Sequence, residues 1–483
     1  MLLDDKIYLG TSTRPEYLAL KYGNRHGLVT GATGTGKTVS LQIMAEGFSR
    51  AGVPVFCADV KGDLAGISMK GTPQDFLTRR AQQIGFTDYA NDAFPTIFWD
   101  LFGAKGHPVR TTISEIGPLL LSRILDLNDV QEGVLNVAFK YADDKGLLLL
   151  DLKDLRALLV AVNDNARDIS ASYGNVATAT IGAVQRALLV LEQQGAGKFF
   201  GEKALDIADL MRIAPDGRGY VSVLAADQLM QAPQLYATFL LWLMSELFEA
   251  LPEVGDLAKP KLVFFFDEAH LLFDGAPKAL VDKVEQVVKL IRSKGVGIYF
   301  ITQNPVDIPD SVLAQLGNRV QHALRAFTPR DQQAVKVAAD TFRPNPAFST
   351  AEVITQLAIG EALVSVLEDG GIPSMVGRTL IRPPSSRIGP IAPGERAAIM
   401  ASSPVGSAYD ATIDRESAYE VLTKKQATAP IPAAPAPRTS TRPSVAEAAM
   451  TSFARAMASS AGRQVMNAVG RALVRGVLGN LLK

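Results

Sequence analysis

A glycine-rich segment of eight residues, 31–38, restricts the architecture of this 483-residue chain more than any other part of its sequence. Residues 26–30 before it form a short apolar run typical of a β-strand, and residues 39–46 after it follow a helical pattern. The segment itself has the spacing G-x-x-x-x-G-K-T. Strand, glycine loop and helix in this order predict a phosphate-binding loop at the start of a helix, whereas a chance glycine-rich turn would need neither flanking element.

The residue types in this loop have separate tasks in holding a nucleotide. The glycines let the backbone turn its N–H groups toward the β- and γ-phosphates. Lys37 would place a positive charge on the phosphates, and Thr38 would offer its hydroxyl group to Mg²⁺. The sequence therefore predicts ATP and Mg²⁺ as cofactors, with Lys37 also assisting catalysis. The predicted nucleotide-binding residues are Gly31, Ala32, Thr33, Gly34, Thr35, Gly36, Lys37 and Thr38.

A pair of acids supplies the second half of the predicted site. Residues 262–266 are a continuous apolar run, and Asp267 and Glu268 follow it directly. Ligands bind at the carboxyl edge of an open α/β sheet, so we expect Asp267 in the Mg²⁺ shell and Glu268 against the attacking water. Taken alone, a strand ending in solvated acids would be the better explanation. Beside the phosphate loop, two adjacent acids favour hydrolysis, whereas a lone aspartate would suit a kinase equally well.

Five further residues have predicted roles around this edge. Gln303 follows an apolar run at residues 297–302, where its amide can bond both the γ-phosphate and water, although a polar strand end is the alternative. Asp59 and Asp63 come at the end of the strand that follows the loop and its helix. They could lie near the metal or its water, and a turn-forming role is the alternative. Arg319 and Arg325 are candidates for an arginine finger that reaches a neighbouring subunit's nucleotide, although surface ion pairing is the commoner fate of arginine.

The rest of the chain reads as an α/β protein with a mainly parallel sheet. Short apolar runs without polar alternation fit strands that helices cover on both faces. Residues 113–210 change to helical periodicity, so we expect a helical insertion that divides the core into residues 1–112 and 211–425. The clearest strand candidates span residues 26–30, 53–58, 96–99, 220–224, 262–266, 297–302 and 362–367.

The C-terminal part differs in composition. Residues 427–443 hold five prolines in seventeen positions, and we expect an extended Pro/Ala-rich linker at 426–443. Residues 444–483 follow as a basic amphipathic helix. The chain as a whole is neutral, but residues 426–483 carry seven basic residues against one acid, so this tail is +6 and the body is −6. The helix could dock a partner protein or an anionic membrane surface, and packing on its own or a neighbouring subunit is the favoured alternative.

Several classes of protein are excluded by composition. Cys57 is the only cysteine, which excludes a disulfide framework and a cysteine-rich zinc site. His270 follows the acid pair without an H-E-x-x-H pattern, which argues against zinc there too. Charged residues follow Met1 almost at once, and no apolar run reaches the ~18 residues of a membrane span. We therefore expect a cytoplasmic protein.

Four motifs together resemble the FtsK–HerA superfamily of ring-forming motor ATPases. They are residues 24–38 (NRHGLVTGATGTGKT), 59–64 (DVKGDL), 265–270 (FFDEAH) and 301–305 (ITQNP). Residues 192–195 (EQQG) and 199–202 (FFGE), with the arginine-rich C-terminal helix, are similar to the YjgR-type HerA-like bacterial proteins. The resemblance implies a RecA-like P-loop ATPase core that assembles into a hexamer, with nucleotide bound between subunits. It also implies double-stranded DNA as the polymer that the ring moves.

Three functions stay open at this point. The first is a DNA translocase or helicase-like motor, against which the negative body counts, although a ring needs basic residues only along its channel. The second is an ATP-driven protein-assembly or membrane-surface-associated ATPase without a nucleic-acid substrate. The third is a small-molecule kinase, which the acid pair and Gln303 disfavour. The β-barrel that precedes the core in HerA-type motors has no room before Gly31, so a nuclease partner is not implied.

Overall fold

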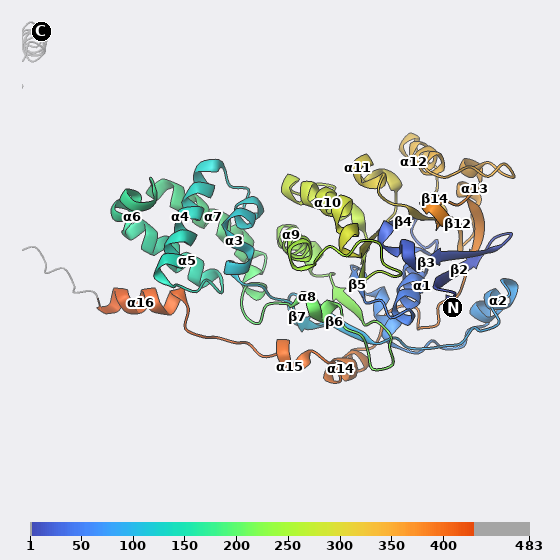
Figure 1. Cartoon of the computed structure of the whole chain (residues 1–483), viewed down its shortest axis with the longest axis horizontal. Helices are drawn as coiled ribbons and strands as arrows, with labels where there is room; N and C mark the ends of the chain where they lie inside the picture. The colour runs from blue at the N-terminus through green and yellow to red at the C-terminus, as the bar shows by residue number, and fades with distance from the viewer. Residues whose placement is uncertain (1, 429–483) are drawn as a thin grey trace, which may run out of the picture. The chain divides into compact units, whose positions relative to one another are not determined.

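The computed structural model describes residues 2–428 (Figure 1). The predicted linker at 426–443 lies outside the described residues except for its first three positions, which end helix α16 (Ala418–Thr428). The predicted basic helix at 444–483 lies entirely outside them. Within the described part, no single helix is long and apolar enough to cross a bilayer. Helices α6 (Ala166–Tyr173) and α7 (Thr178–Gln193) reach that composition only as a pair bent by 98°.

A 13-stranded sheet runs through the chain, and most of it is parallel. The predicted α/β class with a mainly parallel sheet is confirmed. An antiparallel edge adjoins the parallel part through β12, which pairs with β11. The parallel strands, in spatial order, are β11 (Asn318–Gln321), β4 (Gly27–Thr30), β10 (Val296–Thr302), β9 (Leu262–Phe266), β5 (Val55–Asp59), β8 (Val221–Ala225), β6 (Thr96–Asp100) and β7 (His107–Pro108). The antiparallel strands are β12 (Glu361–Ser365), β15 (Gly377–Ile381), β2 (Lys6–Thr11), β1 (Leu2–Leu3) and β3 (Pro15–Ala19).

Central strands have apolar side chains on both faces because helices cover both. On β9, Phe264 and Phe266 pack into one core with helices α9 (Pro233–Ala250) and α10 (Lys278–Leu290). Val263 and Phe265 point the other way, into a second core with helix α1 (Lys37–Arg50). This two-sided burial explains why the strand runs lack polar alternation. Each of the seven predicted runs contains a strand, with ends shifted by up to two residues.

Residues 113–210 contain helices and no strand. Thr112, Asn128 and Asp151 each begin a helix with a capping box, in which the cap side chain accepts backbone N–H bonds. Helix α3 (Ile113–Ile124) packs against α9 of the α/β part, so the two parts share one hydrophobic core. The helical character was predicted, and the domain boundaries at 112/113 and 210/211 stay predictions. The helices are α3 (Ile113–Ile124), α4 (Asp129–Lys145), α5 (Leu152–Asp164), α6, α7 and α8 (Ile207–Leu210).

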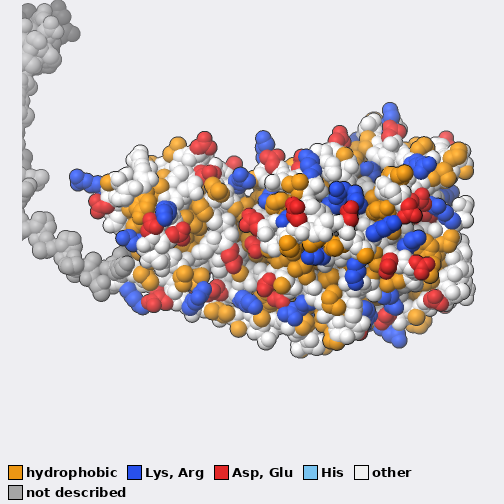
Figure 2. Space-filling model, in the orientation of Figure 1, with side chains coloured by type: hydrophobic (Ala, Val, Ile, Leu, Met, Phe, Trp, Pro, Cys, Tyr) orange, Lys and Arg blue, Asp and Glu red, His pale blue; other side chains and the backbone are white. Residues whose placement is uncertain are grey.

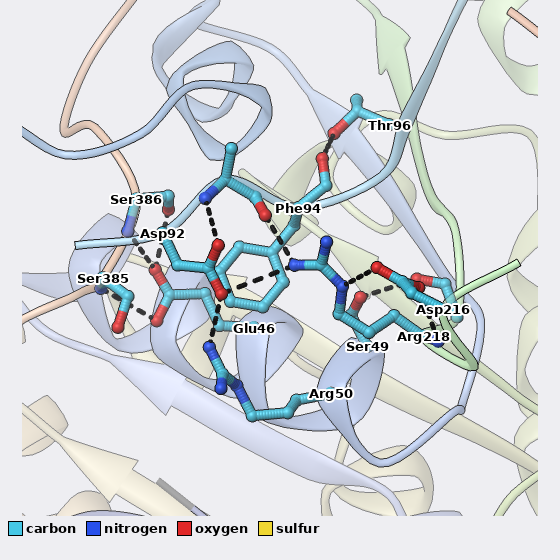
Figure 3. A network of polar contacts seen from close by, with 12 residues as sticks. Glu46, Ser49, Arg50, Asp92, Phe94, Thr96, Asp216, Arg218, Ser385 and Ser386 are labelled. Atoms are coloured by element: carbon cyan, nitrogen blue, oxygen red, sulfur yellow. Dashed lines mark hydrogen bonds and ion pairs between the residues drawn. The ribbon is translucent and has the colours of Figure 1, made fainter. Parts of the chain in front are cut away.

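Helix α1, which starts at the glycine-rich loop, is anchored from its second half by a buried polar network (Figure 3). Glu46 exposes no surface and accepts hydrogen bonds from the backbone N–H groups of Ser385 (3.1 Å) and Ser386 (2.9 Å). The Ser386 hydroxyl adds a bond of 2.7 Å, and Arg382, also fully buried, pairs with Glu46 at 3.1 Å. We call residues 382–387 the return segment. Its contacts with Glu46 fix the direction of α1 and therefore of the loop before it.

Candidate nucleotide site

Four neighbouring strands bring the predicted site residues to one edge of the sheet. Strands β4, β10, β9 and β5 are adjacent and parallel, so their carboxyl ends lie together. The register pairs Thr30 with Thr302, and Phe300 with Phe266. Lys37 follows β4, Gln303 follows β10, the acid pair follows β9, and Asp59 ends β5. Segments more than two hundred positions apart in the sequence thus meet at one place.

The glycine-rich loop turns back over the end of β4 before α1 begins. Gly31, Gly34 and Gly36 have φ angles of 151°, 77° and 115°, values that side chains rarely allow. Lys37 Nζ donates to the carbonyl oxygens of Gly31 (2.6 Å) and Ala32 (3.1 Å). Burial lowers the pKa of the Lys37 ammonium group, and the nearby carboxylates of the acid pair oppose that shift. The loop therefore holds a lysine whose ammonium group is partly desolvated and lies near the two carboxylates of the acid pair.

Three side chains hold Glu268, whose backbone is itself in the left-handed region with φ of 49°. Lys61 forms an ion pair with Glu268, Gln303 Nε2 donates to its Oε2 at 3.3 Å, and His270 Nδ1 lies 3.3 Å from Oε2. Burial raises the pKa of Glu268, but Lys61 and Gln303 outweigh it, so the pKa is lowered below its usual value. Glu268 is therefore held as an ionised carboxylate in a fixed position, as a group that polarises water must be.

Gln303 also connects this carboxylate to the loop. Thr33 Oγ1 donates to Gln303 Oε1 at 3.2 Å, and the other end of the same amide bonds Glu268. A single side chain thus contacts both the phosphate loop and the acid pair. The arrangement suits an amide that senses the nucleotide and orients the attacking water.

Asp267 is buried, like its neighbour Glu268. Burial first, and the adjacent charge of Glu268 second, raise its pKa to about 6. Its Oδ1 accepts the backbone N–H of Glu268 at 3.0 Å, which leaves lone pairs for a metal or its water. Within residues 2–428, no group of three or more His, Cys, Asp or Glu side chains is arranged to hold a metal ion by itself. The roles of Asp267 and Thr38 as Mg²⁺ ligands stay predictions, and in nucleotide sites phosphate oxygens and water complete the metal's coordination.

Asp59 forms a turn at the end of β5. Its carboxylate accepts the N–H groups of Gly62 (2.8 Å) and Leu64 (3.1 Å), and burial raises its pKa to about 6. Asp63 lies half-buried in the first turn of the short 3-10 helix that follows. The turn explains the position of Asp59, and a role of either residue near the metal stays a prediction.

The two candidate arginine fingers differ in exposure. Arg319 Nε and Nη2 donate to the carbonyl oxygens of Leu316 (3.1 Å) and Leu313 (3.0 Å), and burial lowers its pKa to about 10. Arg325 is exposed and donates to the carbonyl oxygen of Thr355 at 3.1 Å. The geometry leaves Arg325 the freer of the two to reach another subunit, and the assignment stays a prediction.

Sequence reasoning missed three residues that the fold brings to the site. Lys61 lies inside the motif at residues 59–64, which predicts no role for it, and the pattern around His270 bears only on zinc. His322 follows the polar strand β11 and was not singled out. The signal in the sequence was weak for Lys61 and His322, because each acts through a contact between segments distant in sequence. Only the position of Lys61, two residues after Asp59 at a predicted strand end, indicates a role near the site.

Comparisons with known proteins identify the relatives of this chain. Its architecture is similar to that of the bacterial conjugative coupling protein TrwB, with a TM-score of 0.51 and 15% identity over 80% of this chain and 92% of that one. TrwB with a non-hydrolysable ATP analogue gives the same TM-score of 0.51, at 15% identity, over 80% and 93% of the two chains. At this identity the likeness shows the fold.

A segment of 120 residues is 30% identical to a probable helicase of Methanocaldococcus jannaschii, and covers 24% of this chain and 21% of that protein. The chain thus matches about a fifth of that relative's length. A family model described as "Helicase HerA-like C-terminal" matches residues 4–483. This match confirms the predicted HerA-type family, while the YjgR-type subgroup stays a prediction. The chain belongs to the helicase HerA-like C-terminal family.

Proposed function

We propose that this HerA-type ATPase is a ring-forming motor that couples hydrolysis of Mg²⁺-bound ATP to movement along double-stranded DNA. The observation that carries the proposal is the continuous contact from Thr33 through Gln303 to Glu268. This contact joins a phosphate loop to a carboxylate that polarises water. A kinase, or a protein that only binds nucleotide, does not require such a carboxylate.

Each residue of the site has a role that follows from its surroundings. The Lys37 ammonium group is partly desolvated, so little water screens its charge. Its electrostatic attraction to the phosphates is therefore stronger than it would be in bulk water. Bound Mg²⁺ would neutralise charge that develops on the phosphates, and Thr38 and Asp267 would hold it. Glu268, ionised and fixed, draws a proton from water, and Gln303 orients that water.

The relatives support the finer parts of this proposal. TrwB is described as a coupling protein of bacterial conjugation and binds an ATP analogue, and the archaeal relative is described as a probable helicase. An arginine finger from a neighbouring subunit, with Arg325 as the favoured residue, would require an oligomer, and a hexamer is the ring we expect. On the face drawn in Figure 2, basic and acidic side chains are interspersed over the described residues. A DNA path along a ring channel would need only a few of these basic groups.

One experiment tests the motor directly. Steady-state ATPase rates would be measured without polymer, with single-stranded DNA and with double-stranded DNA, while the mass of the ATP-bound particle is determined in the same buffer. A hexamer whose rate rises with duplex supports the proposal. An ATPase that ignores all nucleic acid contradicts the DNA part, and a monomer contradicts the ring.

A second candidate is an ATPase that acts on a protein partner. Residues 113–210 hold fourteen acids and nine basic residues, so most of the negative charge of the body lies in the helical segment. The same segment exposes large apolar side chains, among them Leu119 (58%), Val130 (68%) and Val190 (50%). Acidic surface repels DNA, and exposed apolar side chains favour protein contacts. Indifference to DNA in the experiment above would favour this reading.

A further inference from the structure

We propose that His322 is a positioning residue for the phosphate loop, holding the loop and the first turns of α1 at a fixed place over strand β11. The inference rests on the proposed ATP site and adds to it the residue that presets its geometry. His322 does not contact the nucleotide in this proposal. It acts through Ser40 and through the backbone of the loop.

The backbone around His322 extends the sheet into the loop. His322, just past the end of β11, donates its backbone N–H to the carbonyl oxygen of Thr30, the last residue of β4, at 2.7 Å. The N–H of Ala32 donates to the carbonyl oxygen of Ala323, also at 2.7 Å. The first residues of the loop are therefore paired with the segment that carries His322, so their place depends on it.

The imidazole ring of His322 lies wholly inside the protein and bridges two elements. Its Nδ1 lies 2.9 Å from the carbonyl oxygen of Glu361 on β12, and its Nε2 lies 2.8 Å from Ser40 Oγ on α1. A carbonyl oxygen only accepts, so Nδ1 carries the proton and Nε2 accepts from the Ser40 hydroxyl. Burial lowers the pKa of this histidine to about 4, in keeping with a neutral ring. Both ring nitrogens are satisfied, and α1 is tied to β12.

The glycines of the loop leave room for this ring. A Cβ atom at Gly31 would lie 2.5 Å from His322 Cβ, and one at Gly36 would lie 3.3 Å from His322 Cε1. A Cβ atom at Gly34 would meet nothing within 4 Å. Two of the three glycines thus sit against His322, which is a second reason for their small size besides backbone conformation. Gly360 N also donates to the carbonyl oxygen of Thr35 at 3.1 Å, so the strand start beside Glu361 supports the loop as well.

The alternative explanation is that His322 is an ordinary buried histidine that only stabilises the fold. The chain contains a matched example in His26, which is equally buried and whose pKa is also lowered to about 4, mainly by burial. His26 lies at the opposite end of β4 and accepts the N–H of Ile298 at 3.0 Å. Loss of either ring would destabilise the protein, but only loss of His322 would disturb the loop. The two histidines therefore separate positioning from stability.

The test compares Mg²⁺-ATP binding in the full chain for wild type, H322N, H322Q, S40A, the H322N/S40A double variant and H26N. Asn places its amide near Nδ1 and loses the Ser40 contact, whereas Gln places an acceptor near Nε2 and keeps it. We expect the Kd for ATP to rise by about tenfold in H322N and about threefold in S40A, and by no more than about threefold in H322Q. The double variant should bind like H322N, because the two residues act through one hydrogen bond.

Turnover at saturating ATP should fall by less than about threefold in every one of these variants, because the hydrolytic groups are untouched. H26N should lose stability to urea yet keep the Kd within about twofold of wild type. The inference is overturned if wild type binds ATP while S40A and H322N bind with unchanged Kd, or if H26N weakens binding as much as H322N. It is also overturned if the effects of H322N and S40A add in full. S40A removes only a hydroxyl, so it decides the question if H322N does not fold. A wild type that fails to bind ATP would refute the proposed function instead.

Discussion

Removal of the buried carboxylate of Glu46 should destabilise this protein more than any loss of a surface ion pair. Glu46 and Arg382 both expose no side-chain surface, and they pair at 3.1 Å inside the return-segment network. In E46A, Arg382 keeps its charge in an interior that offers only carbonyl oxygens, such as those of Tyr8 and Ile43. The N–H groups of the return segment lose their acceptor in the same step.

The expected size follows from these contacts. Breaking a buried pair by removing one partner costs about 3–5 kcal/mol, because the remaining charge is uncompensated. Net stabilities of domains are about 5–15 kcal/mol, so E46A should be close to the limit of folding. E46Q keeps the shape and one acceptor oxygen, and we expect a loss between those of E46A and a surface variant. Because α1 begins at the phosphate loop, E46A should also weaken ATP binding.

Urea unfolding at neutral pH measures these losses. The matched control is E368A, which removes an exposed pair between Glu368 and Arg14 at 2.6 Å, with exposed fractions of 46% and 52%. Exposed pairs contribute less than about 1 kcal/mol. A free energy of unfolding that falls no further in E46A than in E368A would refute the argument that the network anchors α1.

Three further predictions follow from the site and its surroundings. T38A should raise the Mg²⁺ concentration needed for half-maximal hydrolysis by about tenfold or more, because one metal ligand is lost; an Mg²⁺ titration measures it, and an unchanged midpoint removes Thr38 from the metal. R325A should lower turnover by about a thousandfold with ATP still bound, and normal turnover would exclude it as the finger. Since the folded-state pKa of His26 is lowered to about 4, its neutral form stabilises the protein fully above the unfolded pKa, and this is lost as pH falls toward 4. The loss between pH 7 and pH 5 is about 2 kcal/mol from this group, so wild type should lose more stability than H26N over that interval in urea unfolding. The difference isolates His26 from Asp59 and Asp267, whose raised pKa values act in the opposite direction; equal losses in the two proteins would contradict the assignment.

The sheet was predictable where burial leaves a mark in the sequence. A strand such as β9, covered on both faces, must be apolar at every position, and its end is marked by the first acid, Asp267. Strand β11 lacks such an apolar run, and its sequence NRVQ is typical of a loop, so the sequence does not predict this strand. Asn318 and Gln321 are buried there because their amides find partners, for example Asn318 Nδ2 at 3.1 Å from the Tyr22 carbonyl oxygen. Polar side chains satisfied by tertiary contacts carry no local periodicity.

The site was predictable to the same extent. Lys37 belongs to the phosphate-loop motif, and Asp267 and Glu268 form the acid pair at a strand end. These local patterns predict the roles of the three residues, and the fold brings them together. Lys61 and His322 contribute through contacts with Glu268 and Ser40, and these pairs are 207 and 282 positions apart in sequence. No spacing within one sequence encodes such pairs, since they depend on strand order in the sheet. Strand order placed β5 beside β9 and β11 beside β4, and this made both contacts possible.

The most direct measurement compares ATP binding and single-turnover hydrolysis in wild type, E268Q and K37A. E268Q keeps the shape of the side chain but cannot polarise water, so it should bind Mg²⁺-ATP as tightly as wild type and convert at least about a hundredfold more slowly. K37A should lose binding itself. Hydrolysis by E268Q at the wild-type rate, or tight ATP binding by K37A, would contradict the claim that the loop and the acid pair form one hydrolytic site.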